Sequence, residues 1–383
     1  MDMEKLFEVI ESKRDEYITF LKEIAEIESP TPYKEGVDAV GRYFIEKAIN
    51  HGWKTEVFEQ KKAGNVVVIT MNPQSKEKPF CLSGHIDTVH PVGLFGDPCV
   101  KIDGNKMIGP GVCDCKGGCV NAFWAMDALS EMGYDKRPVM LLLQTDEETS
   151  SRESNKATIG YITERAKDAV AFFNMEPNLS DIGVILERKG IAKFEFTVSG
   201  VSQHASKCYC GASAIAEAAN KILQLEKYKD EDGITCNCGT IKGGTVPNTV
   251  PEKCVFTLDT RFKTQEQYEE ICSFIHKVAE ESSVLNTSCA VREIGYRPSM
   301  PKSEKNYDLL NKTNSILKSA GLNEVKAIFT FGGSDAAYVT LAGIPVIDSM
   351  GVIGDNVHSK DEYILLDKFS LPTKRTAAVI SAI

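Results

Sequence analysis

The segment Pro79-Phe80-Cys81-Leu82-Ser83-Gly84-His85-Ile86-Asp87-Thr88-Val89 runs from an apolar stretch into two ionisable side chains. We expect the apolar part to be a buried β-strand. Residues two apart share one face of a strand, so His85 and Asp87 should point the same way at its carboxyl end. Such a pair suits a metal site in which His85 ligates and Asp87 holds the ligands in position. Alone, a pair of this kind is more often a surface hydrogen bond, so the interpretation depends on the rest of the chain.

Apolar segments and amphipathic helices alternate around this strand. We predict strands at 53–58, 65–71, 138–145 and 169–175, and helices at 4–28, 36–51 and 117–132. Segment 66–69 is apolar on both faces, as an interior strand of a covered sheet should be. Alternation of this kind predicts an α/β domain with a mostly parallel sheet, in which ligands collect at the carboxyl ends of the strands.

The pattern changes near residue 188. The following block reads as a strand at 191–198, a helix at 212–225, strands at 234–241 and 254–262, a helix at 265–281 and a strand at 287–294. This β-α-β-β-α-β order is typical of a ferredoxin-like α+β sandwich. The α/β pattern returns after residue 298. We therefore expect a catalytic domain formed by residues 1–187 and 299–383, with residues 188–298 inserted as a second domain.

Length and charge limit the possible functions. A chain of 383 residues is expected to form two domains. Its net charge of −10 and lack of a basic block argue against a nucleic-acid partner. Residues 1–5 lack the basic start of a signal peptide, and no apolar run reaches membrane-spanning length. We expect a cytoplasmic protein without a membrane partner.

The chain has 12 cysteines, which we interpret as reduced thiols because they are spread along a large chain without an export signal. Three C-x-C pairs occur, at 113 and 115, at 208 and 210, and at 236 and 238. Structural zinc sites usually have C-x-x-C spacing, so we do not expect such a site at any of the three.

Acids and histidines follow the predicted strands and loops of the α/β domain. They are His85 with Asp87, Asp114, Glu147 with Glu148, Glu176 and His358. Two histidines and three carboxylates form a nitrogen and oxygen donor set that suits two Zn²⁺, Mn²⁺ or Co²⁺ ions. Asp114 could bridge the ions, with His85 and Glu176 on one, and Glu148 and His358 on the other.

The remaining acid, Glu147, suits a different role. Two ions about 3.5–4 Å apart lower the pKa of a water between them. Glu147 neighbours a proposed ligand but need not point at the metals, so it could take the water's proton and pass it to a leaving amine.

Each of these residues also has an ordinary structural interpretation. Glu147 and Glu148 could lie in a solvated loop, Asp114 could cap the helix after it, and His358 could be a surface histidine. The joint pattern favours the metal site, because two of only six histidines fall at predicted strand or loop ends beside acids.

These motifs, in this order, resemble the signature series of the co-catalytic zinc exopeptidases and amidohydrolases, a family that includes glutamate carboxypeptidase, acetylornithine deacetylase and succinyl-diaminopimelate desuccinylase. The matching segments are 83–89, 109–118, 147–148, 175–177, 200–205 and 332–338. The resemblance implies the fold and metal roles given above, with Asp87 behind the ligands and Glu147 as acid and base. It also implies that the inserted domain serves as a lid and dimerisation module. Cys113 and Cys115 flank Asp114 where the family commonly has other residues, which could alter metal preference.

Within the family, the C-terminal part is most similar to glutamate carboxypeptidase. The resemblance implies that His204 reaches the active site of a partner subunit and stabilises the oxyanion of the tetrahedral intermediate. It also implies substrate binding by Asn248, Arg261, Arg297 and Gly333, in which the two guanidinium groups suit capture of a carboxylate. Without the resemblance, Arg261 could equally form a strand-edge salt bridge.

The sequence thus predicts a homodimeric, dinuclear metal-dependent hydrolase, with Zn²⁺ as the first choice and Co²⁺ or Mn²⁺ as alternatives. The expected substrate is a small peptide whose scissile amide bond lies next to a free carboxylate. A deacylase of N-acyl amino acids is the nearest alternative. A non-catalytic binding protein on the same fold is a third possibility, disfavoured because Glu147 and every expected ligand are present.

Overall fold

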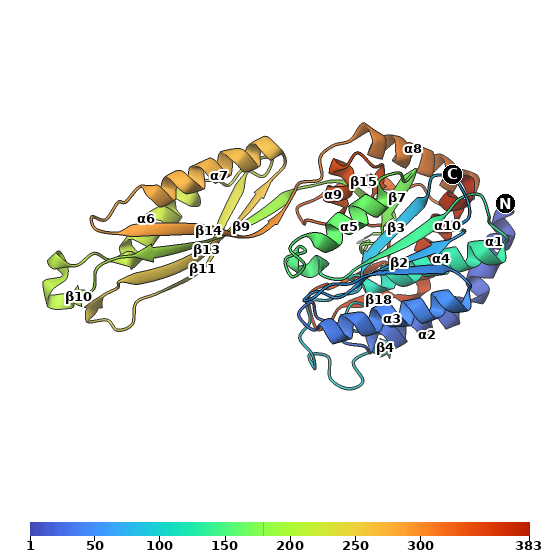
Figure 1. Ribbon diagram of the computed structural model, residues 1–383, viewed down its shortest axis with the longest axis horizontal. Helices are drawn as coiled ribbons and strands as arrows, with labels where there is room; N and C mark the ends of the chain where they lie inside the picture. Colours follow the sequence, from blue (N-terminus) through green and yellow to red (C-terminus); the bar gives the residue numbers. More distant parts are fainter. Residues whose placement is uncertain (179) are drawn as a thin grey trace. The chain divides into compact units, whose positions relative to one another are not determined.

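The computed structural model describes residues 1–178 and 180–383 and divides them into two compact units (Figure 1). The first unit comprises Met1–Leu186, Lys302–Phe329 and Tyr338–Ile383, and the second comprises Glu187–Pro301 and Thr330–Ala337. The short segment 330–337 groups with the second unit, whereas the sequence had placed it in the C-terminal part of the catalytic domain.

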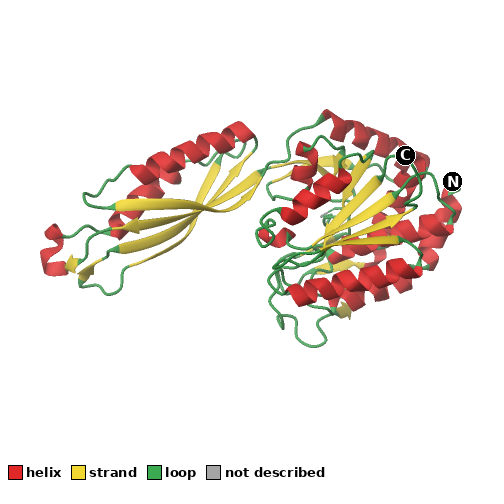
Figure 2. Cartoon of the chain, viewed as in Figure 1, coloured by secondary structure: helices red, strands yellow, loops and turns green. Residues whose placement is uncertain are grey.

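A six-stranded mixed sheet forms the centre of the first unit (Figure 2). Its strands, in spatial order, are β1 (Lys54–Phe58), β2 (Val66–Met71), β6 (Val139–Gln144), β3 (Phe80–His85), β7 (Ala171–Asn174) and β16 (Val346–Ile347). The pairs β6–β3, β3–β7 and β7–β16 are parallel, and the pairs β1–β2 and β2–β6 are antiparallel. All residues of β2, β3 and β6 are buried, as the apolar runs predicted. The expected α/β fold class is confirmed.

Helices lie on both sides of this sheet (Figure 2). They are α1 (Met3–Ser12), α2 (Arg14–Ala25), α3 (Lys34–Asn50), α4 (Lys116–Glu131), α5 (Ala157–Ala166), α8 (Glu304–Ser319), α9 (Ala336–Leu341) and α10 (Ser370–Ala382). Helix α4 is buried along most of its length, and its Trp124 stacks on Tyr17 of α2 with ring centroids 4.9 Å apart. Among the described helices, none combines the length and apolar character needed to span a membrane.

A smaller antiparallel sheet pairs two strands near the C-terminus with two strands from residues 101–108. Its order is β17 (Gly354–Asp355), β18 (Tyr363–Leu365), β5 (Lys106–Ile108) and β4 (Lys101–Asp103). Because β18 pairs with β5, the loop that contains His358 lies beside the segment leading to Asp114. A separate two-stranded sheet joins β8 (Gly183–Arg188) to β15 (Lys326–Thr330).

The second unit is a four-stranded antiparallel sheet with two helices. Its elements along the chain are β9 (Gly190–Ser199), α6 (Ala214–Leu225), β11 (Thr235–Gly243), β13 (Lys253–Phe262), α7 (Gln265–Glu280) and β14 (Ser288–Arg297). The spatial strand order β11-β13-β9-β14 is that of a ferredoxin-like sandwich. Alternate residues of β9 and β13 are buried and form one core with both helices. A two-stranded sheet, β10 (Gln203–His204) with β12 (Thr249–Val250), and the 3₁₀ helix η2 (Ala205–Cys210) complete the unit.

Candidate metal centre

His85 is the last residue of β3, and its imidazole is buried. Nδ1 lies 3.0 Å from the backbone oxygen of Asp87, and Nε2 lies 2.9 Å from Oδ1 of Asp114. A carbonyl oxygen can only accept, so in a neutral ring the proton belongs on Nδ1. The lone pair of Nε2 is then directed at the acidic cluster, which is the orientation that a metal ligand needs.

The carboxylate of Asp87 organises the acidic turn after β6. Oδ2 accepts hydrogen bonds from the Thr31 hydroxyl at 2.7 Å and from the Glu148 N–H at 3.2 Å. Oδ1 accepts the Glu147 N–H at 3.3 Å and lies 3.4 Å from Nδ1 of His85. Asp87 therefore holds the imidazole mainly through its backbone oxygen, while its side chain fixes the backbone of both glutamates.

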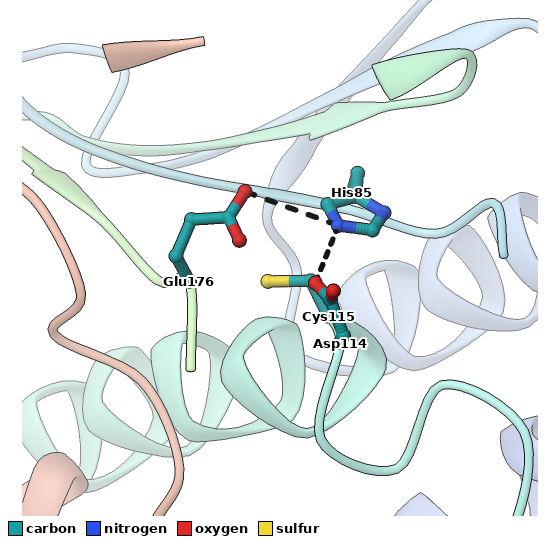
Figure 3. Close-up of side chains that lie close together, drawn as sticks. All are labelled: His85, Asp114, Cys115 and Glu176. Atoms are coloured by element: carbon teal, nitrogen blue, oxygen red, sulfur yellow. Dashed lines mark hydrogen bonds and ion pairs between the residues drawn. The ribbon is translucent and has the colours of Figure 1, made fainter. Parts of the chain in front are cut away.

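Asp114 lies between two histidines. Oδ1 faces His85, and Oδ2 lies 3.3 Å from Nε2 of His358. Nε2 of His358 is also 3.3 Å from Oε2 of Glu148. On the other side of Asp114, Glu176 Oε1 is 3.9 Å from Nε2 of His85 (Figure 3). Within the described residues, the donor atoms form two groups, each contained within 4.8 Å. One group is His85, Asp114, Cys115 and Glu176, and the other is Asp114, Glu148 and His358. Asp114 belongs to both.

Two glycines at the start of α4 allow this arrangement. A Cβ added at Gly118 would lie 1.8 Å from the backbone oxygen of Met175, and one added at Gly117 would lie 2.2 Å from that of Val112. No side chain fits at these separations. Glycine at 118 therefore lets the helix start close to the end of β7, and glycine at 117 lets the preceding loop fold back onto the helix start. The close packing places Asp114 beside Glu176.

Electrostatic shifts reflect the crowding of acids. Burial, followed by the charges of Asp114 and Glu147, raises the pKa of Glu176 well above its usual range. Burial also raises the pKa of Glu148 to about 7, although His358 opposes the shift. Hydrogen bonds to Asp114 and Glu148 raise the pKa of His358 to about 10. The raised pKa values of Glu148 and Glu176 mark two buried carboxylates with too little positive charge beside them. Divalent cations would supply that charge.

Opposing effects act on the pKa values of Asp114 and His85. Burial raises the pKa of Asp114, but hydrogen bonds to His358 and His85 outweigh it and leave the pKa well below the usual range. Burial lowers the pKa of His85, but hydrogen bonds to Asp114 and Asp87 raise it well above normal. Imidazole nitrogens and carboxylate oxygens at these separations fit a pair of divalent metal ions.

Glu147 lies next to the cluster without joining either donor group of the described chain. It begins the 3₁₀ turn η1 (Glu147–Thr149) after β6 and is 6% exposed. Its charge raises the pKa of both Glu148 and Glu176, so its carboxylate is electrostatically close to them. This position suits a group that exchanges protons at the centre.

Glu362 is a residue at the centre that the sequence pattern did not reveal. Its carboxylate is buried, accepts the backbone N–H groups of Cys113 and Asp114, and contacts His90. The only available signal was an acid four residues after His358 in the same loop. Thr31 was also missed. It lies far from Asp87 in the sequence, and no motif links its hydroxyl to that carboxylate.

The remaining predicted residues, His204, Asn248, Arg261, Arg297 and Gly333, lie in the second unit. His204 is exposed, and its Nδ1 accepts the Ser206 N–H at 3.2 Å. The backbone oxygen of Asn248 accepts the N–H of Ala205 at 2.9 Å, so Asn248 lies beside the His204 segment.

Segment 330–337 brings the other three together. A Cβ at Gly333 would lie 2.8 Å from Cδ of Arg297 and 2.9 Å from Cδ1 of Ile191, so glycine lets both side chains pack against this backbone without shifting. Arg261 donates to both carboxylate oxygens of Asp259, at 2.7 and 3.1 Å, and to the backbone oxygen of Phe331 at 3.1 Å. The ion pair considered for Arg261 therefore exists in this structure, but it is not at a strand edge, because β13 lies between β11 and β9.

Comparison with known proteins matches residues 81–381 to the family model "Peptidase family M20/M25/M40". Carboxypeptidase G2 from Pseudomonas sp. (strain RS-16) is 29% identical, with 94% of this chain and 87% of the relative covered. Succinyl-diaminopimelate desuccinylase from Rickettsia bellii (strain OSU 85-389) is 23% identical, with 91% of each covered. The crystal structure of the YXEP protein of Bacillus subtilis, a dinuclear metal-binding peptidase from the M20 family, superposes with a TM-score of 0.69 at 16% identity and covers 97% of this chain and 98% of that one.

Proposed function

The chain belongs to peptidase family M20/M25/M40 and is a hydrolase of that family, and on this premise we propose that it cleaves a peptide or amide bond next to a free carboxylate, using two divalent metal ions. The observation that carries the proposal is the position of Asp114, whose two carboxylate oxygens face different histidines. A single carboxylate shared by two donor groups is the arrangement expected of a bridging ligand.

The donor groups define which residues would hold each ion. His85, Asp114 and Glu176 would hold one, and Asp114, Glu148 and His358 the other. When bound, two such cations polarise a carbonyl and lower the pKa of a shared water. Zn²⁺ suits the imidazole and carboxylate donors best, and Co²⁺ and Mn²⁺ are alternatives.

Glu147 would move protons in this reaction. Its carboxylate would accept a proton from the attacking water and deliver it to the nitrogen of the leaving amine, since an amide nitrogen leaves easily only when protonated. Its backbone N–H is fixed by Asp87, which also holds the His85 ring, so one residue orients both the proton carrier and a metal ligand. General acid–base catalysis of this kind is typically worth about 10²–10⁴-fold in rate.

The second unit would supply substrate recognition as a lid and dimerisation module. Arg261 and Arg297 would bind the substrate carboxylate, with Asn248 and Gly333 beside them, and His204 would stabilise the oxyanion in a partner subunit. The similarity to carboxypeptidase G2 along 94% of the chain supports a carboxypeptidase-type substrate. The similarity to a succinyl-diaminopimelate desuccinylase keeps N-acyl amino acids as the second candidate class.

The decisive experiment separates metal binding from proton transfer. Glu147→Gln protein should keep two metal ions per chain yet lose most of its turnover, about 10²–10⁴-fold. His85→Ala protein should lose metal as well. Glu164→Gln is a suitable control because Glu164 is an exposed residue of α5 that pairs with Lys167 on the protein surface. Near-normal turnover in metal-loaded Glu147→Gln would refute the role of Glu147.

A substrate panel then distinguishes the classes. Peptides with a free C-terminal carboxylate should be better substrates than N-acyl amino acids, compared by kcat/KM on the metal-loaded protein. The reverse preference would identify a deacylase. A protein that binds two ions but hydrolyses neither class would support the non-catalytic alternative.

A further inference from the structure

A thiol lies within one of the two donor groups. Sγ of Cys115 is within 4.8 Å of the donor atoms of His85, Asp114 and Glu176, and Figure 3 shows the sulfur directed towards Glu176. We propose that the Cys115 thiolate is a direct ligand of the metal ion held by these three residues, so that this position is a mixed nitrogen, oxygen and sulfur site. The inference rests on the dinuclear site proposed above.

Local contacts hold the sulfur at the centre. The Cys115 thiol donates to the backbone oxygen of Met175 at 3.0 Å, and Met175 directly precedes Glu176. On its other side, the sulfur packs against Gly84, the residue before His85. A Cβ added at Gly84 would lie 3.3 Å from Sγ of Cys115 and 2.7 Å from Sγ of Cys119, so the glycine leaves the space that the sulfurs occupy. The Cys115 side chain is fully buried, and bulk solvent does not compete for it.

The two neighbouring cysteines provide a contrast. Cys119 lies one helical turn further along α4, and its thiol donates to the backbone oxygen of His85 at 3.5 Å. Sγ of Cys113 would lie 2.8 Å from a Cβ placed on Gly354, away from the donor group. All three are buried in the same region of the described chain, yet only Cys115 contributes a donor atom to the cluster.

Metal ligation by this thiol involves no change of oxidation state. The S–H bond breaks, the proton leaves to solvent, and a sulfur–metal bond forms in place of the hydrogen bond to Met175. Thiolate is a soft ligand, so the position that includes Cys115 should favour Zn²⁺, Co²⁺ or Cd²⁺ over Mn²⁺. The position formed by Asp114, Glu148 and His358 has no sulfur donor and should discriminate less between these ions and Mn²⁺.

Cobalt spectroscopy tests the ligand directly. Metal-free protein is titrated with Co²⁺ while visible ligand-field bands report cobalt binding and near-ultraviolet sulfur-to-cobalt charge transfer reports a thiolate ligand. We expect a charge-transfer band in the wild type, its loss in Cys115→Ser and its retention in the matched control Cys119→Ser. A wild type that binds two Co²⁺ per chain without the band refutes the inference but leaves the dinuclear site intact. A wild type that binds no Co²⁺ refutes both.

Ion competition adds a second readout that does not depend on turnover. Loss of a residue that merely orients a ligand typically costs about 10- to 100-fold in metal affinity, so loss of a true ligand should cost at least as much. Cys115→Ser should therefore weaken Cd²⁺ binding at one of two positions by at least about tenfold, with a smaller change for Mn²⁺. An equal loss for both ions would indicate a packing role and contradict ligation. If the variant does not fold, the wild-type cobalt spectrum decides alone.

Discussion

Oε1 of Glu362 accepts the backbone N–H of Asp114 at 2.9 Å, so an acid from the C-terminal loop fixes the residue that both donor groups share. The same oxygen accepts the N–H of Cys113 at 2.9 Å, and Oε2 lies 2.6 Å from Nε2 of His90. Glu362 is therefore held by three contacts and holds the Asp114 backbone in turn. Its effect on the centre is indirect, through the position of Asp114.

We predict that Glu362→Gln weakens metal binding. The amide has one acceptor oxygen and no charge, so it cannot serve the two N–H groups and His90 as the carboxylate does. Loss of such a supporting contact typically costs about 10- to 100-fold in metal affinity. The measurement is competition with a chelator, and turnover at saturating metal should recover most of its wild-type value. Asp361→Asn, a change at the exposed neighbour, is the control. Unchanged affinity in Glu362→Gln would contradict the prediction.

The sequence predicted the central strands and the convergence of the candidate donor residues for a common physical reason. Strands β2, β3 and β6 are short, mainly apolar segments, and such segments are typical of strands that are buried on both faces. The carboxyl ends of parallel strands meet at one edge, so acids and histidines after β3, β6 and β7 could be expected to converge. His358 follows no strand of this sheet and lies in the loop between β17 and β18, so convergence of parallel strands does not explain its place; the sequence offered only a histidine in a loop close to acids.

What the sequence did not predict depends on contacts between distant residues. Lys13 divides the single helix expected at 4–28 into α1 and α2, although lysine does not break helices; its Nζ instead pairs with Asp127 and Glu131 of α4. Helix α5 was not anticipated at all. Segment 330–337 groups with the second unit, where Gly333 packs against Arg297 and Phe331 accepts a hydrogen bond from Arg261, and no local sequence pattern predicts these contacts.

A buried ion pair should control the stability of the second unit. Nζ of Lys221 lies 2.9 Å from Glu217, both side chains are fully buried, and the lysine also donates to the backbone oxygen of Val278 at 2.6 Å. The glutamate accepts the N–H groups of Ser283 and Val284, at 2.9 and 2.7 Å. The pair therefore fastens α6 to the chain that follows α7.

We predict that Glu217→Ala lowers the free energy of unfolding by about 3–5 kcal/mol, because it leaves a buried lysine without its counter-ion. Denaturant unfolding of the whole chain, followed by a probe in the second unit, provides the measurement. Lys277→Ala removes an exposed i,i+4 pair with Glu281 and should cost only about 0.3–0.5 kcal/mol. Equal effects of the two changes would show that burial adds nothing to the Glu217–Lys221 pair.

Subunit mixing tests the proposed role of His204. If His204 acts in the active site of a partner, inactive Glu147→Gln and inactive His204→Ala subunits should regain activity when mixed, because one site of each heterodimer then has both residues intact. Turnover is measured after subunit exchange has been verified with differently labelled chains. Exchange without recovery would refute action across the interface and place His204 in its own subunit's chemistry or in none.

The last prediction concerns the substrate carboxylate. The protein has a net charge of −10, so an anionic substrate requires local cations, and Arg261 is one candidate. In this structure its guanidinium donates to Asp259 and to the Phe331 backbone, so a substrate carboxylate would have to share or replace Asp259 as its partner.

Converting the carboxylate to an amide should remove charge-assisted hydrogen bonds of about 1.5–3 kcal/mol each, and hence about tenfold or more in kcat/KM. Arg261→Ala should show a similar loss with the acid substrate. In that variant the amide should suffer little further penalty, because both changes delete one interaction. The four kcat/KM values, from acid and amide on wild type and Arg261→Ala, give the coupling directly. Strictly additive losses would mean that Arg261 does not contact the carboxylate and that its role is structural, through Asp259 and the Phe331 backbone.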